Sequence, residues 1–315
     1  MPANAHVLPR YQQGPRSQQL LTILLGDYWH LRSEPIPSAA LVDLLGTFGI
    51  SGPGARAAIQ RLAQRGFFVA LREGRTSAYA VRQMSQEAID RHVSLLFDSH
   101  LQEPWDGTWT LVAYSLPEGS RSTRHVLREQ LRRHKFGNLY DALWIRPGDS
   151  MAEVEAIRRA LGDALMPDQL TAFVGARLPA VDSAPQAVET AFGVAEHANS
   201  YRAFSERWRS VGERLAKHAP QREPADVDRQ DDALRTRTSI MREWRELRHA
   251  DPMLPAEVLA LSSPLDEALR VCTAVYDPLG PLAEAAFRRR IQRYGEALAS
   301  LTSHHTFAGS TRLLG

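Results

Sequence analysis

The amino-acid sequence predicts an α+β multidomain protein made of three successive parts. A helix–turn–helix–hairpin pattern covers 37–82, strands and helices alternate over 105–176, and only helical periodicity follows from about 185 onward. The chain has 315 residues, which is long for one domain and sufficient for two or three. Its 43% of hydrophobic residues can form substantial cores.

The N-terminal part begins with an arm, residues 1–15, whose richness in Pro, Gln and Gly predicts disorder. Ser17 is placed to cap a first helix that ends near Leu31. A second helix follows, because apolar residues recur at i, i+3, i+4 and i+7: Leu41, Leu44, Leu45 and Phe48.

A glycine-punctuated turn then leads into a short basic helix, which Ser51 can cap and Gly66 can end. Its apolar arc carries Ala55, Ala58, Ile59 and Leu62, and residues 67–81 alternate as a two-stranded hairpin does. Residues 16–84 therefore have the layout of a winged helix-turn-helix DNA-binding domain. In such a domain the second helix enters the major groove and the hairpin contacts phosphate.

The outward arc of this helix and the hairpin tip supply the residues expected to contact double-stranded operator DNA. Arginine can donate two parallel hydrogen bonds to guanine, and glutamine suits the edge of adenine. The free N–H groups at the helix N-terminus can approach a phosphate. The predicted contacts are Ser51, Gly52, Gly54, Arg56, Gln60, Arg61, Gln64, Arg72, Arg75 and Thr76. A merely solvated polar face is the alternative.

The same glycines also match a dinucleotide-binding fingerprint. Residues 52–57 read G-x-G-x-x-A, and Glu73 lies at about the right distance to hold a ribose hydroxyl. That fingerprint needs a strand immediately before the glycines, whereas the preceding segment has helical periodicity. A nucleotide-binding enzyme using Gly52 and Gly54 therefore stays as the alternative function.

The middle part, 105–180, follows a connecting helix and linker over 85–104. Its pattern is β-α-β-β-α-β, the ferredoxin-like arrangement, which we expect to serve as a dimerisation domain. Similar folds form metal-dependent nucleases in CRISPR systems, with an aspartate at the end of the first strand. Here that strand ends at Ser115, and the next carboxylate is Glu118, so a nuclease is a weaker alternative. The intervening helix carries arginines that could add DNA contacts or form a solvated face: Arg121, Arg124, Arg128, Arg132 and Arg133.

The C-terminal part, 185–303, is predicted to be all-helical, and residues 304–315 are predicted to form a flexible tail. The formal net charge of +2 means that nucleic-acid affinity must come from local basic clusters. Cys272 is the single cysteine, and no apolar run approaches a membrane-spanning length. The first residues have no signal-peptide pattern, so we expect a cytoplasmic protein without membrane partners.

Several segments, in this order, resemble the PaaX family of bacterial repressors of phenylacetate catabolism. They are RSQQLLTILLGDYW, FGISGPGARAAIQRLAQRGFFVALREGRTSAYAV, WDGTWTLVAYSLPE, FGNLYDALWIRP, YRAF and REWRELRHADPMLPAEVL, spanning about 16–300. The resemblance implies a winged helix, a ferredoxin-like middle domain and a helical C-terminal domain. It also implies a homodimeric transcriptional repressor, released from its operator by an aryl- or acyl-CoA thioester.

Such an effector needs arginines for its phosphates and an apolar slot for its acyl group. The C-terminal part offers candidates, although aromatic residues at helical spacing usually form core: Tyr201, Arg202, Trp208, Trp244, Arg245 and Arg248. The sequence departs from the family pattern at ALSSPLDEAL, after DPMLPAEVL, and at Gly52-Pro53-Gly54. We find no Ser-His-Asp, paired-carboxylate or P-loop motif, so we expect neither an enzyme nor a cofactor.

Overall fold

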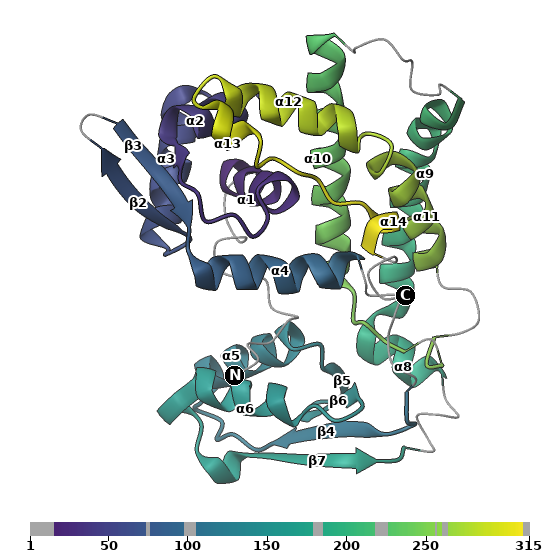
Figure 1. Cartoon of the computed structure of the whole chain (residues 1–315). Helices are drawn as coiled ribbons and strands as arrows, with labels where there is room; N and C mark the ends of the chain where they lie inside the picture. Colours follow the sequence, from purple (N-terminus) through teal and green to yellow (C-terminus); the bar gives the residue numbers. More distant parts are fainter. Residues whose placement is uncertain are drawn as a thin grey trace. The chain divides into compact units, whose positions relative to one another are not determined.

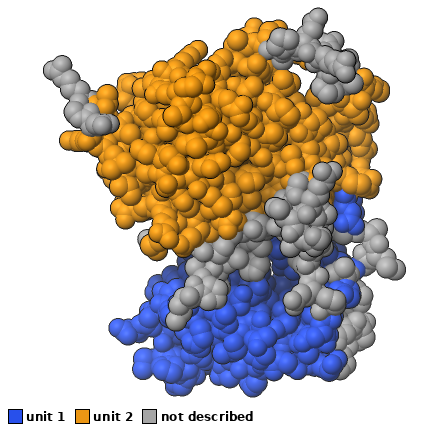
Figure 2. All heavy atoms as spheres, viewed as in Figure 1, with its two compact units in different colours: residues 1–7, 101–203, 247–266 blue, residues 8–100, 204–246, 267–315 orange. Residues whose placement is uncertain are grey.

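The computed structural model describes residues 16–73, 76–97, 105–178, 185–217, 226–255, 257–259 and 264–310. The chain divides into two compact units (Figure 2). Unit 1 contains the described residues of 101–203 and 247–266. Unit 2 contains those of 8–100, 204–246 and 267–315.

Unit 2 begins with a mixed helix-and-sheet segment (Figure 1). Apart from the short strand β1, its elements follow the order expected from the sequence. They are α1 (Arg16–Tyr28), β1 (Ile36–Pro37), α2 (Ser38–Gly46), α3 (Gly52–Gln64), β2 (Phe68–Glu73), β3 (Thr76–Val81) and α4 (Gln83–Phe97). The three strands form an antiparallel sheet in the order β1-β3-β2, and β2 pairs with β3 from Phe68↔Val81 to Glu73↔Thr76.

Helix α1 lies deep in the core of unit 2. Leu21 and Leu24 are fully buried, and even its polar residues Gln18 and Thr22 are no more than 1% exposed. The ring of Tyr28 stacks on that of Phe287, with centroids 5.1 Å apart. Because Phe287 belongs to a C-terminal helix, the first helix and the last part of the chain share one core.

Unit 1 is built around an antiparallel four-stranded sheet in the order β5-β6-β4-β7. The β-α-β-β-α-β pattern predicted for the middle part is the one observed. Its elements are β4 (Trp109–Tyr114), α5 (Arg121–Arg133), β5 (Gly137–Tyr140), β6 (Leu143–Pro147), α6 (Met151–Leu161) and β7 (Leu170–Ala176). Two short 3-10 turns, η2 (Gly162–Ala164) and η3 (Pro167–Gln169), connect α6 to β7.

The two faces of this sheet are covered by different parts of the chain. Leu127 and Leu131 of α5 and Ile157 of α6 pack with Val112 and Trp144 of the sheet. On the other face, a second cluster joins Trp109, Ile145, Val188, Phe192 and Leu254. The contact is close, because a Cβ placed on Gly137 would lie 2.7 Å from the Phe192 ring. Helix α8 (Pro185–Phe192) therefore completes the fold of unit 1.

The C-terminal part is helical, as expected from the sequence, but its helices are shared between the units. They are α9 (Val194–Lys217), α10 (Val227–Ala250), α11 (Pro264–Tyr276), α12 (Gly280–Gln292), α13 (Glu296–Ala299) and α14 (Phe307–Ser310). The start of α9, the end of α10 and the first residues of α11 belong to unit 1, and the remainder belongs to unit 2. The predicted C-terminal part therefore contributes to both units.

The tail differs from the flexible segment expected from residue 304. Phe307 is 5% exposed, and its ring lies against those of Phe97, Trp244 and Tyr276. The carboxylate of Asp277 accepts hydrogen bonds from the N–H groups of Phe307 (2.9 Å) and Ala308 (3.1 Å). The small, polar residues of the tail predicted flexibility, and the packing of Phe307 was missed.

We predict that Phe307→Ala lowers the free energy of unfolding by about 3 kcal/mol, because a buried ring is deleted from a packed site. Urea denaturation followed by circular dichroism measures this change. Tyr294→Ala is the matched control, since Tyr294 is an aromatic residue of the same unit that is 39% exposed. Equal stability of the Phe307→Ala variant and the unchanged protein would show that the tail is not docked.

We also predict that His305 makes the stability of the fold sensitive to acid. The centroid of its ring lies 4.6 Å from that of the His30 ring. Burial lowers the pKa of His305 to about 4, and the neighbouring His30 and Arg237 act in the same direction. Between pH 6.5 and 4 the unfolded chain therefore binds a proton that the folded chain does not, and stability falls as the pH falls. His305→Gln should make the decline in melting temperature over this range shallower. An unchanged pH profile would contradict this assignment.

Candidate nucleic-acid interface

The start of α3 is an ordered helix N-terminus at the surface. Ser51 is extended (φ −63°, ψ 152°), and its Oγ accepts a hydrogen bond of 3.4 Å from the N–H of Gly54. Pro53 lies in the first turn, where backbone N–H groups have no acceptor within the helix, so the N–H that proline lacks is not missed. The predicted capping role of Ser51 is confirmed. The N–H of Gly54 is used by this cap, and that of Ala55 donates to the carbonyl of Ser51 (2.8 Å), so the N–H of Gly52 and the positive end of the helix dipole are what favour an anion here.

The two arcs of α3 differ sharply in exposure. Ala55, Ala58, Ile59 and Leu62 are at most 1% exposed. Arg56, Gln60, Arg61 and Gln64 are all exposed. The guanidinium group of Arg56 turns toward the first turn of the helix, because a Cβ placed on Gly52 would lie 3.5 Å from its Nη2. The structure thus brings one cation close to Gly52, at the start of the helix.

The other end of α3 is fixed by hydrogen bonds and packing. Gly66 has φ +79°, and the N–H of Phe67 donates to the carbonyl of Leu62 at 2.9 Å, as in a Schellman motif. Nη1 of Arg65 donates to Oε1 of Gln18 in α1 at 3.0 Å. The rings of Phe67 and Phe68 meet edge to face at 4.8 Å and start the hairpin from the core. The exposed arc is therefore carried by a well-anchored helix.

The hairpin extends beside α3 (Figure 1). Arg72 and Thr76 are exposed near its tip, and Arg75 lies outside the described residues. Sequence reasoning missed a second feature: Val69 (39%) and Leu71 (44%) are exposed on one face of β2. Strict alternation would have placed one of the two hairpin faces in the core. Among the strand side chains that the structure describes, however, only Phe68 and Val81 at the base of the hairpin are buried.

The structure removes the context that a dinucleotide fingerprint requires. Helix α2 and a turn, rather than a strand, precede Gly52 and Gly54. Strand β2, which ends at Glu73, pairs directly with β3 instead of crossing over to a parallel neighbour. The nucleotide-binding alternative is therefore not favoured.

The nuclease alternative has no metal site among the residues that the structure describes. No group of three or more His, Cys, Asp or Glu residues there is close enough to hold a metal ion. Several arginines of α5 have structural partners: Arg124 donates to the carbonyl of Leu116 (3.0 Å), and Arg128 donates to the hydroxyl of Tyr114 (2.8 Å). Arg132 pairs with Glu129 (2.9 Å), while Arg121 and Arg133 are exposed.

The effector candidates occupy two units. Tyr201, Arg202 and Arg248 belong to unit 1, where Nη1 of Arg248 donates to Tyr201 (3.1 Å) and to Asp251 (2.6 Å). Burial, followed by the charge of Asp251, raises the pKa of Tyr201.

Trp208, Trp244 and Arg245 belong to unit 2. The indole N–H of Trp208 donates to Glu243 (3.0 Å), and that of the buried Trp244 donates to the carbonyl of Leu96 (3.2 Å). Effector binding by these residues stays a prediction.

Comparison with known proteins gives three family matches in chain order. Residues 16–84 match a PaaX-like protein model, 102–187 match the PaaX protein central Cas2-like domain, and 192–289 match the PaaX-like protein C-terminal domain. The chain belongs to the PaaX family. The resemblance drawn from the sequence motifs is therefore confirmed.

Two individual proteins extend these PaaX-family matches. Transcriptional repressor PaaX from Escherichia coli (strain K12) is 27% identical over 270 residues, which are 84% of this chain and 81% of that protein. The structure of the uncharacterized protein Rv0674 from Mycobacterium tuberculosis is similar with a TM-score of 0.52. That match covers 87% of this chain and 96% of that chain at 20% identity, and it supports the fold alone. None of the helices described here is both long and apolar enough to cross a membrane.

Proposed function

We propose that this PaaX-family protein is a DNA-binding transcriptional repressor that reads its operator with α3. The observation that carries the proposal is the exposed face of α3, with Arg56, Gln60, Arg61 and Gln64 on a helix whose other face is buried. The name of the E. coli relative supports the repressor function. That name also favours a regulator over an enzyme.

The N-terminal segment supports a winged helix-turn-helix interpretation. Helices α1, α2 and α3, the short strand β1 and the β2–β3 hairpin follow the order of that fold, with α3 as the recognition helix and the hairpin as the wing. The N-terminus of α3 would hold a backbone phosphate beside Arg56. Gln60 and Arg61 would then face base edges, and Arg72 and Thr76 would approach the backbone from the wing.

The repressor would act as a homodimer. Two recognition helices related by a two-fold axis would read a palindromic operator, with half-sites separated by whole turns of about 34 Å. We propose unit 1 as a contributor to the dimer interface.

A small effector would release the repressor by binding more tightly to a dimer conformation in which the spacing of the two recognition helices does not match the operator half-sites. We propose an aryl- or acyl-CoA thioester as that effector, held in part by residues of the C-terminal helices. Release of labelled operator by a panel of acyl-CoAs tests this. Failure of all of them would remove the effector class without touching the DNA-binding assignment.

We predict that Arg56→Ala and Arg61→Ala each weaken operator binding by about 10-fold or more where the arginine contacts a base. The reason is the loss of two parallel hydrogen bonds, or of a phosphate contact. Fluorescence anisotropy with an operator selected from random DNA measures the dissociation constants. Arg159→Ala is a matched control, because Arg159 is an exposed helical arginine of unit 1.

Circular dichroism should show both α3 variants folded, since their side chains are exposed. Operator affinity unchanged by both substitutions would remove α3 as the recognition helix. A further check is the salt dependence of binding, whose slope should become shallower by about one for each lost phosphate contact.

A further inference from the structure

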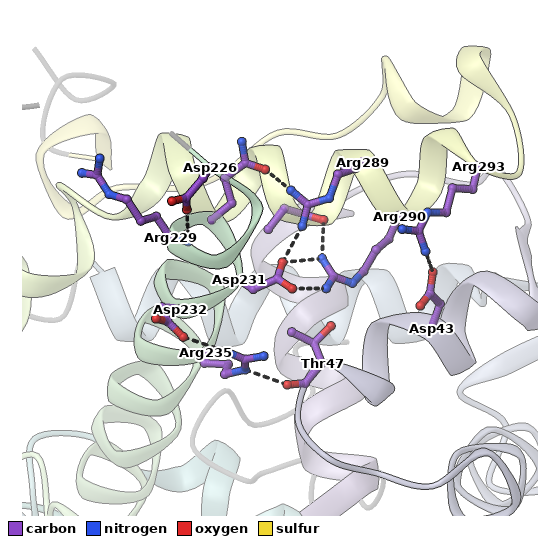
Figure 3. A network of polar contacts seen from close by, with 12 residues as sticks. Asp43, Thr47, Asp226, Arg229, Asp231, Asp232, Arg235, Arg289, Arg290 and Arg293 are labelled. Atoms are coloured by element: carbon purple, nitrogen blue, oxygen red, sulfur yellow. Dashed lines mark hydrogen bonds and ion pairs between the residues drawn. The ribbon is translucent and has the colours of Figure 1, made fainter. Parts of the chain in front are cut away.

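Helices α10 and α12 of unit 2 are joined by a partly buried ion cluster (Figure 3). Asp231 of α10 accepts hydrogen bonds from Arg290 through Nη1 (2.8 Å) and Nη2 (2.6 Å), and from Nη2 of Arg289 (2.5 Å). The side chains of Asp231 and Arg290 are only 14% and 10% exposed. A carboxylate that accepts from two arginines in this way restricts the geometry of the contact between α10 and α12.

The charges in this cluster compensate one another. Burial alone would raise the pKa of Asp231, but the hydrogen bonds and charges of Arg290 and Arg289 outweigh burial and lower that pKa. The carboxylate is therefore ionised over the neutral range, and it neutralises part of the charge of the two arginines. We refer to Asp231, Arg289 and Arg290 as the Asp231 clamp.

Two further arginines of the same helices reach α2. Nε of Arg235 in α10 donates to the carbonyl of Thr47 at 2.8 Å. Nη1 of Arg293, which follows α12 as its C-cap, pairs with Oδ2 of Asp43 at 2.9 Å. Figure 3 shows both contacts beside the Asp231 clamp. The C-terminal end of α2 is thus bonded to α10 through Arg235 and to the end of α12 through Arg293, and the Asp231 clamp joins those two helices.

These contacts act at the end of α2 that leads into α3. Thr47 is the C-cap of α2 and is 9% exposed. No further helical turn supplies an N–H donor for its carbonyl, and little water can reach it. The guanidinium of Arg235 supplies the missing donor, and its charge suits the negative end of the helix dipole. A short turn then runs from Thr47 to Ser51, the cap of α3.

The packing of α2 against α3 carries the position of one helix to the other. Leu41, Leu44 and Leu45 of α2 are fully buried, as are Ala55 and Leu62 of α3. Such a packed pair moves as one body, because interiors at crystal-like density transmit displacement. Displacing the end of α2 would therefore displace the start of α3, where Arg56 lies beside Gly52.

We infer that Arg235 and Arg293 are positioning residues for operator recognition, and that the Asp231 clamp makes them act as one unit. Neither arginine need touch DNA. They hold the α2–α3 pair in the orientation that lets the exposed face of α3 enter the major groove. The inference rests on the function proposed above, and it adds to that function a connection between the C-terminal helices and the recognition helix.

The test compares operator DNA with a non-specific duplex of equal length. The double variant Arg235→Met/Arg293→Met should lose about 3- to 10-fold in affinity for the operator, the range expected when residues outside a site alter its geometry. Its affinity for the non-specific duplex should change much less, because non-specific binding needs phosphate contacts but no fixed helix orientation. Hydrogen exchange of the amides from Thr47 to Gln60 should be faster than in the unchanged protein.

Three comparisons separate positioning from loss of charge or loss of stability. Arg293→Lys keeps a cation for Asp43 and should retain most of the operator affinity. The charge swap Asp43→Arg/Arg293→Asp keeps the net charge and should recover affinity relative to Arg293→Asp alone. Arg270→Met is the matched control, because Arg270 is 75% exposed and pairs with Glu267 of its own helix. It should leave operator affinity and hydrogen exchange unchanged.

The clamp is tested through additivity. Asp231→Asn should weaken operator binding by itself, and adding Arg235→Met/Arg293→Met should then cost less than it costs in the unchanged protein, because residues acting as one unit are not additive. Fully additive losses would overturn the role of the clamp. Equal losses on both DNAs, or unchanged operator affinity, would overturn the positioning role.

The hydrogen-exchange arm does not depend on DNA. Unchanged exchange between Thr47 and Gln60 in the double variant would overturn the inference even if the protein proves to be a repressor. Conversely, an unchanged protein that selects no DNA sequence would contradict the proposed function, whereas faster exchange in the variant would still show that the arginines hold α2 and α3.

Discussion

The fold of unit 2 depends on one buried cation. Arg237 of α10 is fully buried, and its guanidinium carbon lies 3.7 Å from the centroid of the Tyr276 ring and 5.2 Å from that of Tyr28. Its Nη1 is 3.9 Å from Oδ2 of Asp27, and its Nε donates to the carbonyl of Tyr276 at 3.1 Å. It also donates to the carbonyl of His305. A buried charge is tolerated only where such partners surround it, so these segments must assemble together.

This constraint explains why the N-terminal segment and the C-terminal helices form one unit. Asp27 and Tyr28 lie at the end of α1, Tyr276 ends α11, and His305 belongs to the tail. Burial raises the pKa of Asp27, and the charge of Arg237 opposes that rise. Because α1 is enclosed in this way, α2 and α3 pack on a rigid support, and the polar face of α3 remains at the surface.

Local sequence signals predicted the elements that depend on neighbouring residues. The period of the apolar residues, Ser51 and Gly66 defined α3, alternation defined the β2–β3 hairpin, and apolar or extended runs defined the strands of unit 1. The same signals could not distinguish Arg235 from Arg237. These residues are two positions apart on α10, yet the side chain of Arg235 is 48% exposed and that of Arg237 is fully buried. Their partners, Thr47 and Asp27, are distant in the sequence, and no local pattern encodes such a pairing. Phe307 was missed for the same reason, since its anchoring depends on rings from three other helices.

The strengths of these contacts are ordered in a way that suits a regulated DNA-binding protein. The Arg237 site is closed to water, and removing one partner would leave a buried charge, which costs about 3–5 kcal/mol. The pair of Arg293 and Asp43 is instead 61% and 30% exposed, and exposed pairs of this kind contribute about 1 kcal/mol or less. A repressor that must release its operator needs a contact that can change without unfolding the support beneath it. The exposed ion pair between Arg293 and Asp43 is weak enough to break, whereas the core around Arg237 would stay folded. Any ligand that favours one arrangement of α10 and α12 would therefore act first on α2, and through its packing on α3.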